Sequence, residues 1–340
     1  MTETATTAAV PLADRAPLLE VEGLNIWLPG PAGALEIVEG VDLSVRPGEV
    51  LGIAGESGSG KTITALSLMG LLPRGGVARG RARLGEHELL SLRKRAWHRV
   101  RGVDIAMVFQ DPMTSLHPML TIERQLTEHI RDHGLGDRQQ ARERARDLLG
   151  KVRIPDPDTA LGAYPHQFSG GMRQRVAIAM ALACEPKLLI ADEPTTALDV
   201  TVQAGILHLL RDLCTDTSMA VILVTHDLGV MSSVADSLAV FYAGRVVERG
   251  TLSQLLTAPR HPYTRGLLDA LPGEHGGAAA ESFEAIPGSP PQPGARPSGC
   301  SFHPRCRFAE PACGQREPDL VHLADGRWLA CPVDPLEAAR

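Results

Sequence analysis

A glycine-rich stretch that ends in a lysine carries the strongest chemical signal in the sequence. It matches the pattern G-x-x-x-x-G-K-[ST] in eight consecutive residues: Gly55, Glu56, Ser57, Gly58, Ser59, Gly60, Lys61 and Thr62. Glycines let a backbone curl so that several N–H groups point at phosphate oxygens, and a following helix N-terminus adds partial positive charge. We therefore predict a phosphate-binding loop in which Lys61 reaches the β- and γ-phosphates of a nucleotide and the Thr62 hydroxyl binds Mg²⁺. A glycine turn that caps a helix is the alternative, and the strand expected before the loop argues against it.

Two adjacent carboxylates supply the other half of this chemistry. Asp192 and Glu193 follow the apolar residues 188–191. Alone the pattern is weak, because many buried strands end in a capping acid. Beside a phosphate loop, Asp192 is placed to hold Mg²⁺ directly or through water. Glu193 is then the candidate general base for the attacking water.

Two further polar residues follow apolar strands. His226 comes after residues 219–225, and Gln110 comes after residues 103–109. Ligands bind in the crevice outside the carboxyl ends of parallel strands. We therefore expect His226 to hydrogen-bond the γ-phosphate and Gln110 to touch Mg²⁺ or the attacking water. A structural histidine and an exposed glutamine are the alternatives.

The elements that must position these residues alternate between strand and helix. Alternation or short apolar runs predict strands over residues 18–24, 37–45, 50–54, 103–109, 188–191 and 219–225. Helical periodicity predicts helices over residues 62–72, 121–150 and 170–184. Strands separated by helices indicate an α/β fold with a mainly parallel sheet that is covered on both faces.

Composition divides the chain into three parts. Residues 1–17 are expected to be a flexible N-terminus, because they lack the basic start and apolar stretch of a signal peptide. Residues 18–258 would form one nucleotide-binding unit. Residues 259–340 would form an accessory segment, since proline and glycine dominate residues 272–299 and hydrophobic periodicity fades.

The whole chain also excludes some classes of function. No apolar run approaches the roughly 20 residues that cross a bilayer, so any membrane role requires docking onto other subunits. The formal net charge of −6 argues against nucleic acid as a partner. An arginine-rich stretch over residues 79–101 is interpreted as a solvated flank for the same reason.

Residues 168–175, FSGGMRQR, resemble the signature loop of ABC ATPases. The phosphate loop, Gln110, this loop, the Asp192–Glu193 pair, residues 197–199 as the D-loop and His226 occur in the order of that family. The resemblance implies a P-loop NTPase core of the ABC type, with a mainly parallel sheet and an antiparallel β-subdomain. It also implies a helical subdomain at about residues 111–168 and a small cysteine-rich C-terminal extension.

The resemblance further implies a head-to-tail dimer that sandwiches two ATP molecules. Ser169, Gly170 and Gly171 would contact the ATP held by the partner's phosphate loop, and Asp199 would belong to the D-loop beside it. Trp27 is the candidate for stacking on adenine, and a core tryptophan is the alternative.

Three segments resemble importers of dipeptides, oligopeptides and nickel: residues 109–118, 164–167 and 261–265. Phe168 and Met172 in the signature resemble the D-type ATPase of those systems, which works beside an F-type ATPase. The resemblance covers residues 18–332. It implies an ATP-hydrolysing subunit of a peptide importer at the cytoplasmic face of the membrane, with two transmembrane permease subunits and an extracytoplasmic solute-binding protein as partners. An importer for nickel or another small solute, or a non-transport ABC ATPase, is the alternative.

A cysteine cluster occupies the last part of the sequence: Cys300, Cys306, Cys313 and Cys331. In a reducing compartment such a cluster indicates metal more than disulfides. Four thiolates could hold Zn²⁺ or a 4Fe–4S cluster, and the absence of C-x-x-C pairs leaves both open. The family resemblance favours 4Fe–4S over zinc, and places unliganded thiols last. Cys184 and Cys214 are expected to pack as small apolar residues.

Overall fold

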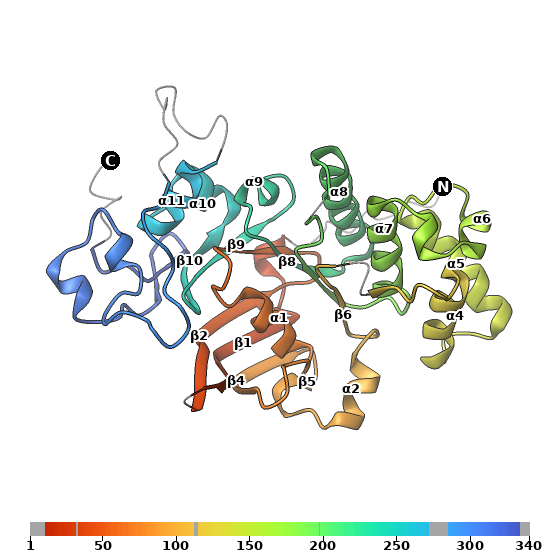
Figure 1. Cartoon of the computed structure of the whole chain (residues 1–340), viewed down its shortest axis with the longest axis horizontal. Helices are drawn as coiled ribbons and strands as arrows, with labels where there is room; N and C mark the ends of the chain where they lie inside the picture. The colour runs from red at the N-terminus through yellow and green to blue at the C-terminus, as the bar shows by residue number, and fades with distance from the viewer. Residues whose placement is uncertain (1–10, 32, 112–114, 197, 272–284, 334–340) are drawn as a thin grey trace, which may run out of the picture.

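Two sheets form the framework of the molecule (Figure 1). The computed structural model describes residues 11–31, 33–111, 115–196, 198–271 and 285–333. The main sheet has eight strands in the order β11-β12-β10-β9-β3-β8-β7-β6, and a smaller sheet has the order β2-β1-β4-β5. The N-terminal residues 1–10 and the segments around 112–114, 197 and 272–284 lie outside the described residues, so part of the predicted importer stretch and Ala197 of the predicted D-loop are not assessed.

Five parallel strands make the centre of the main sheet: β6 (Ile105–Val108), β7 (Leu188–Asp192), β8 (Ala220–Val224), β3 (Val50–Ala54) and β9 (Ser237–Tyr242). Every residue of β3, β6, β7 and β8 is buried, because layers cover both faces of the sheet. That burial explains why these strands are uninterrupted apolar runs. Their carboxyl ends meet at one edge, as predicted, so the loops that carry the candidate site residues start side by side.

The smaller sheet is antiparallel and packs against the main sheet. Its strands are β1 (Leu19–Gly30), β2 (Gly33–Val45), β4 (Val77–Leu84) and β5 (His87–Glu88). The predicted strands over residues 18–24 and 37–45 are confirmed but are longer in the structure. Their outer ends escaped prediction because register shifts interrupt the β1–β2 pairing after Val21 and Leu24, which breaks the alternation of buried and exposed residues.

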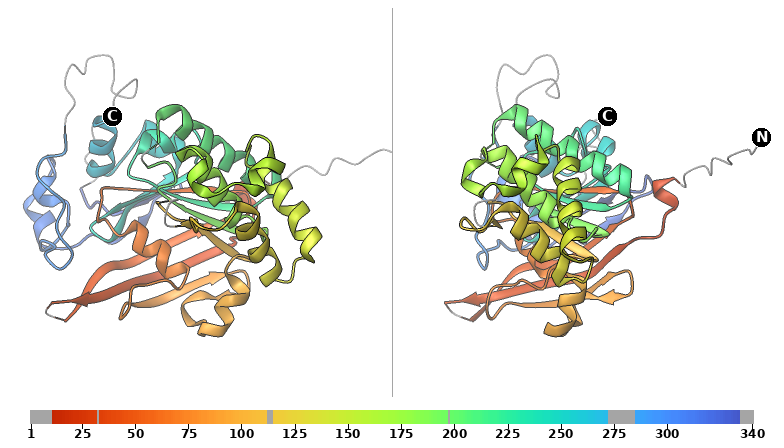
Figure 2. Two further views of the ribbon diagram at one scale, coloured as in Figure 1. Left: turned by 45° about the vertical axis from the view of Figure 1, so that its right-hand side comes forward. Right: turned by 90° about the vertical axis from the view of Figure 1, so that its right-hand side faces the viewer.

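Helices occupy the remaining layers: α1 (Lys61–Leu68), α2 (Lys94–Val100), α4 (Ile122–Asp132), α5 (Arg138–Lys151), α6 (Pro157–Gly162), α7 (Gly170–Ala181), α8 (Val200–Thr217), α9 (Leu228–Met231), α10 (Leu252–Thr257) and α11 (Pro262–Asp269). The single helix expected over residues 121–150 is two helices, since Gly134 and Gly136 have positive φ and Asp137 begins α5 with a capping box. Helices α4, α5 and α6 lie together at one side of the main sheet (Figure 2). In the described part of the chain, no helix has the length and apolarity to cross a membrane.

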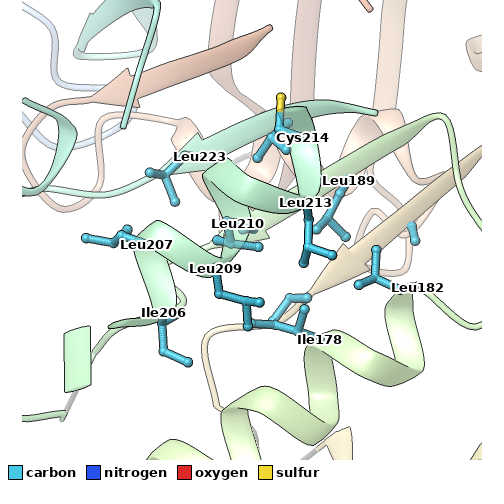
Figure 3. Packing of buried hydrophobic residues seen from close by; sticks show 14 of the residues in the cluster. Ile178, Leu182, Leu189, Ile206, Leu207, Leu209, Leu210, Leu213, Cys214 and Leu223 are labelled. Carbon is cyan, nitrogen blue, oxygen red and sulfur yellow. The ribbon is translucent and has the colours of Figure 1, made fainter. Parts of the chain in front are cut away.

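Apolar side chains fill both faces of the main sheet. One cluster joins the sheet to helices α4–α8, and the other joins it to the antiparallel sheet and α1. Figure 3 shows part of the first cluster, where Ile178 of α7 and Leu182 at its C-cap lie near Leu209 and Leu213 of α8. Cys214 is fully buried in this cluster, and Cys184 is nearly so, in agreement with an apolar packing role.

The C-terminal segment is joined to the main sheet. Strand β12 (Trp328–Leu329) pairs antiparallel with β10 (Arg245–Thr251), and β11 (Val321–His322) pairs with β12. Sheet pairing thus crosses the boundary predicted at residue 259. Strands of two residues give no periodicity, which is why the sequence of this segment showed none. The segment occupies one end of the molecule in Figure 1, drawn in blue.

Candidate nucleotide site

The phosphate loop connects the buried strand β3 to helix α1, as predicted. Its shape depends on glycine at two positions. Gly60 has φ +101° at the N-cap of α1, a conformation that L side chains rarely adopt. A Cβ at Gly55 would lie 2.1 Å from the carbonyl oxygen of Phe241, so β9 leaves no room for a side chain there. The loop is therefore a close-packed turn at the edge of the sheet.

Lys61 lies across this loop and is 5% exposed. Its Nζ donates hydrogen bonds to the carbonyl oxygens of Gly55 and Glu56, at 2.7 and 2.9 Å, and contacts the Ser59 hydroxyl at 3.4 Å. Burial lowers the pKa of Lys61, although the nearby carboxylates oppose the shift. The ammonium group is thus fixed where the loop would receive phosphate.

Thr62 and Asp192 lie next to each other, as their predicted roles require. The Thr62 hydroxyl donates to Asp192 Oδ1 at 3.1 Å, and Asp192 is buried at the end of β7. Burial raises the pKa of Asp192, and the hydrogen bond from Thr62 partly offsets this rise. A hydroxyl and a carboxylate are hard oxygen donors of the kind that Mg²⁺ prefers, so this pair fits the predicted ion.

Glu193, directly after Asp192, is the centre of a hydrogen-bond cluster. Its Oε2 accepts from Gln110 Nε2 at 2.8 Å and from the Thr196 hydroxyl at 3.0 Å, and its Oε1 lies 3.0 Å from His226 Nδ1. Burial alone would raise the pKa of Glu193, but the hydrogen bonds from His226 and Thr196 outweigh it and the pKa is lowered. The residue has φ +45°, an uncommon value for a side chain other than glycine. The backbone is held there by a bond from the Glu193 N–H to the Val224 carbonyl, 2.8 Å long.

This cluster brings together Gln110, Glu193 and His226, which the sequence placed after three different strands. Gln110 contacts Glu193 and no bond from it to Asp192 is described, so its predicted role at Mg²⁺ stays a prediction. Thr196 was not anticipated. It lies three residues after Glu193, and only the folded turn shows that its hydroxyl returns to the carboxylate.

A cavity of about 780 Å³ lies between the phosphate loop and the Glu193 cluster. Its volume falls within the range that suits a small ligand such as a nucleotide. The lining residues that were not predicted from the sequence are Thr196 and four apolar residues: Ile37, Ile63, Leu267 and Pro293. Trp27 is not among the lining residues. Its ring lies on β1 beneath the Arg79 guanidinium, with 5.5 Å between the guanidinium carbon and the ring centroid, so its role at adenine stays a prediction.

The signature residues lie outside this cavity. Ser169 caps α7, its hydroxyl accepting the N–H of Met172 at 3.3 Å, and Asp199 caps α8 by accepting the N–H of Val202 at 3.0 Å. A Cβ at Gly171 would lie 2.5 Å from Val202 Cγ1, and one at Gly170 would lie 3.3 Å from Leu198. The two glycines thus let the predicted signature pack against Leu198 of the predicted D-loop and against the first turn of α8.

The four C-terminal cysteines line one small pocket, and none forms a disulfide. Burial raises the pKa of Cys300 to about 11 and also raises the pKa of Cys306 and Cys331, so none of these thiols is ionised by its protein surroundings. Among the described residues, a tighter group of metal-binding atoms lies elsewhere: those of His129, His133 and Cys184 are within 4.8 Å of one another. The predicted metal centre at the four cysteines therefore stays a prediction.

A parallel sheet with a phosphate loop, paired carboxylates and a separate helical layer defines an ATP-binding cassette. The comparisons agree. The family model described as "ABC transporter" matches residues 38–196, and that described as "Oligopeptide/dipeptide transporter, C-terminal region" matches residues 247–313. Among solved structures, a dimeric ATP-binding cassette in a post-hydrolysis state with ADP and Pi has a TM-score of 0.61 and 27% identity, covering 69% of this chain and 98% of its own.

Similar proteins from other organisms indicate which kind of ATP-binding cassette this chain contains. A putative peptide import ATP-binding protein of Brucella abortus is 49% identical over 93% of this chain and 95% of the relative. The dipeptide transport ATP-binding protein DppD of Escherichia coli is 46% identical over 93% and 97%. The oligopeptide transport ATP-binding protein AppD of Bacillus subtilis is 45% identical over 92% and 96%. The chain therefore belongs to the ABC transporter family, among the ATP-binding proteins of the oligopeptide and dipeptide importers, and the predicted resemblance is confirmed.

Proposed function

We propose that this chain binds and hydrolyses ATP to power the import of peptides. The observation that supports this most directly is the arrangement across one cavity. Lys61, Thr62 and Glu193 all line this cavity, and the Thr62 hydroxyl is hydrogen-bonded to Asp192 behind it. Phosphoryl transfer needs positioning and charge neutralisation more than covalent chemistry by the protein, and this cavity offers both.

Each residue has a distinct task in this proposal. The phosphate loop and Lys61 bind the β- and γ-phosphates, while Thr62 and Asp192 would hold Mg²⁺, which neutralises charge on the phosphates when bound. Glu193 orients and deprotonates the attacking water. The Glu193 carboxylate, whose pKa is lowered, is ionised at neutral pH and can therefore accept a hydrogen bond from the water and then its proton. Gln110, Thr196 and His226 hold Glu193 in place.

The proposal includes a second ATPase subunit, of the F-type. Ser169, Gly170 and Gly171 lie outside the cavity of their own chain, and a helix N-terminus offers N–H groups and positive charge to an anion. We propose that these residues complete the partner's site, with Asp199 beside them. Two permease subunits and an extracytoplasmic solute-binding protein complete the importer, which places this chain at the cytoplasmic face of the membrane.

Two substitutions separate binding from turnover. Lys61→Ala removes the buried ammonium group and should abolish measurable Mg-ATP binding. Glu193→Gln should retain binding but slow hydrolysis by about 100-fold or more, because general-base catalysis contributes on that order. Glu143→Gln, an exposed glutamate on α5, is the matched control and should behave as wild type. Normal hydrolysis by Glu193→Gln in the assembled complex would refute the assignment of the base.

For the cysteine pocket we propose a 4Fe–4S cluster in preference to Zn²⁺. Four cysteines around one pocket support a metal centre, and the C-terminal match to oligopeptide and dipeptide transporters extends to Cys313. Anaerobic purification followed by iron, sulfide and zinc analysis tests the choice. About four irons per chain and a brown colour are expected. Colourless protein with zinc and no iron would overturn it.

A further inference from the structure

An arginine of the C-terminal extension, Arg305, forms an ion pair with Glu56 of the phosphate loop. Arg305 ends a short 3₁₀ turn (His303–Arg305) between Cys300 and Cys306, and it is 7% exposed. Its Nη1 donates to Glu56 Oε2 at 2.6 Å, and its Nη2 donates to Glu56 Oε1 at 2.9 Å. The ion pair is bidentate, which is the strongest geometry for an arginine and a carboxylate. Both oxygens of the loop carboxylate are therefore held by the extension.

The surroundings of Arg305 fix its orientation. Its Nε donates to the carbonyl of Pro287 at 2.8 Å, and its Nη1 also contacts the Tyr242 hydroxyl at 3.3 Å. The guanidinium carbon lies 5.8 Å from the centroid of the Tyr242 ring. The hydrogen bond to Glu56 raises the pKa of Arg305, so the guanidinium stays charged. A side chain held at three points has little rotamer freedom left to lose, and the pair with Glu56 is preorganised.

The same loop residue is also held through its backbone. The Glu56 N–H donates to the hydroxyl of Tyr263 on α11 at 2.8 Å. Tyr263 is fully buried, with the Phe302 ring centroid 5.3 Å from its own. The side chain and the backbone of Glu56 are thus both bonded to residues within the range 242–305. The extension also reaches the cavity itself through Pro293.

The ion pair with Arg305 neutralises the one carboxylate within the phosphate loop, that of Glu56. A carboxylate within a phosphate-binding turn repels the phosphates of ATP, and such repulsion is strong where water is excluded. We propose that Arg305 is a positioning residue of the nucleotide site: it neutralises Glu56 and holds it away from the phosphates, so that the C-terminal extension sets the affinity of the loop for Mg-ATP. This inference rests on the proposed ATP binding at the loop.

The test compares two arginines of the extension. Arg305→Met removes the charge and retains the length of the side chain. Arg296→Met is the control, because Arg296 also joins the extension to the core, through Glu39 at 2.5 Å and the Ile37 carbonyl at 3.1 Å. Ile37 lines the cavity, but no hydrogen bond joins Arg296 to the described residues 55–62, so the control tests docking of the extension without the ion pair to the loop. We expect Arg305→Met to raise the Kd for Mg-ATP about tenfold, because Glu56 without its cation repels the phosphates, and a repulsion of about 1.4 kcal/mol corresponds to that factor. Arg296→Met should change it less than about twofold, a shift of under about 0.4 kcal/mol.

Three readouts separate positioning from general damage. In the assembled ATPase, Arg305→Met should raise KM and leave kcat within about threefold, which corresponds to lost binding without lost transition-state contacts. Adding Glu56→Gln to Arg305→Met should restore most of the affinity, because no loop charge then needs a partner. Arg305→Lys, which retains the charge without the bidentate geometry, should give an intermediate Kd and also serves if Arg305→Met does not fold.

The outcomes distinguish this inference from the proposed function. Wild-type protein that fails to bind Mg-ATP would refute the proposed function itself. Wild-type binding with an unchanged Kd in both Arg305→Met and Arg305→Lys would refute only the role of Arg305. Equal losses in Arg305→Met and Arg296→Met, with no recovery on adding Glu56→Gln, would show that docking of the extension matters and that the ion pair does not.

Discussion

A buried ion pair between strand β10 and the turn before β12 gives a sharp stability prediction. Arg327 is 5% exposed, and its Nη1 lies 3.5 Å from Glu248 Oε1 and 2.6 Å from the Ala258 carbonyl. Glu248 is fully buried and also accepts the backbone N–H groups of Arg260 and His261, at 2.8 and 3.1 Å. Arg327→Met leaves this carboxylate without its cation. The perturbation therefore creates an uncompensated buried charge while keeping the volume of the side chain.

The magnitude follows from the geometry. Removing one partner of a buried pair costs about 3–5 kcal/mol. The 3.5 Å contact is long and two backbone N–H groups remain on Glu248, so we expect the lower end, about 3 kcal/mol of unfolding free energy at pH 7.5. Urea unfolding followed by tryptophan fluorescence measures it. Arg316→Met is the control, because Arg316 pairs with Asp319 at an exposed site, and it should change stability by less than about 0.5 kcal/mol.

The pH dependence of this loss has a definite sign. Burial raises the pKa of Glu248 above its ordinary value of 4.5, and Arg327 partly opposes that rise. Without Arg327 the folded-state pKa rises further, so the unfolded chain gives up the proton first as the pH increases. The penalty is therefore largest well above pH 4.5 and shrinks as Glu248 becomes protonated. Adding Glu248→Gln should recover most of the loss. A deficit below about 1 kcal/mol at pH 7.5, or one that grows at pH 5, would refute the reasoning.

Gly171→Ala places a methyl group 2.5 Å from Val202 Cγ1 and should lower the free energy of unfolding, measured in urea, by about 1–3 kcal/mol. Adding Val202→Ala should recover much of this loss. If Gly171→Ala were as stable as the wild type, the close packing of Gly171 against Val202 would be contradicted. Cys306→Ser should lower bound iron per chain, whereas Cys214→Ser, a buried cysteine outside the pocket, should leave it unchanged; equal iron in both would exclude Cys306 as a ligand. Burial and the positive charge of His133 lower the pKa of His129 below 6.5, so its contribution to stability is present above pH 6.5 and is lost as the pH falls through the folded-state pKa. His129→Gln should accordingly flatten the fall in melting temperature between about pH 7 and 5, and an unaltered slope would rule out this origin.

The nucleotide site was predictable because most of its functional residues lie in short contiguous motifs. The loop that contains Lys61 and the pair Asp192–Glu193 each follow a buried strand, and parallel strands bring such positions to one edge. The partners that complete the site are not contiguous. Arg305 is 249 residues from Glu56, and nothing in the local sequence of either residue signals their pairing. Thr196 was missed for another reason: its hydroxyl reaches Glu193 only because the backbone turns sharply at that residue.

The secondary structure likewise divides into strands that the local sequence predicts and strands that depend on distant partners. Runs such as β7 and β8 are long enough and apolar enough to be recognised, whereas β12 has two residues and depends on β10 for its existence. Trp27 lies on β1 under the Arg79 guanidinium, a contact that the sequence did not indicate, and its role at adenine stays a prediction. Sequence patterns thus predicted the elements, and tertiary contacts decided which side chains share a surface.

The pairing of β12 with β10 has a consequence for handling the protein. Exposed strand edges present rows of unpaired N–H and C=O groups that recruit other chains, and very short outer strands are a common protection against this. Here the seven-residue β10 is bordered by a two-residue β12. A truncated version that stops at residue 258 would uncover β10 and also lose the cation beside Glu248. Such a fragment would be prone to aggregate, so the cassette is best produced with its C-terminal segment attached.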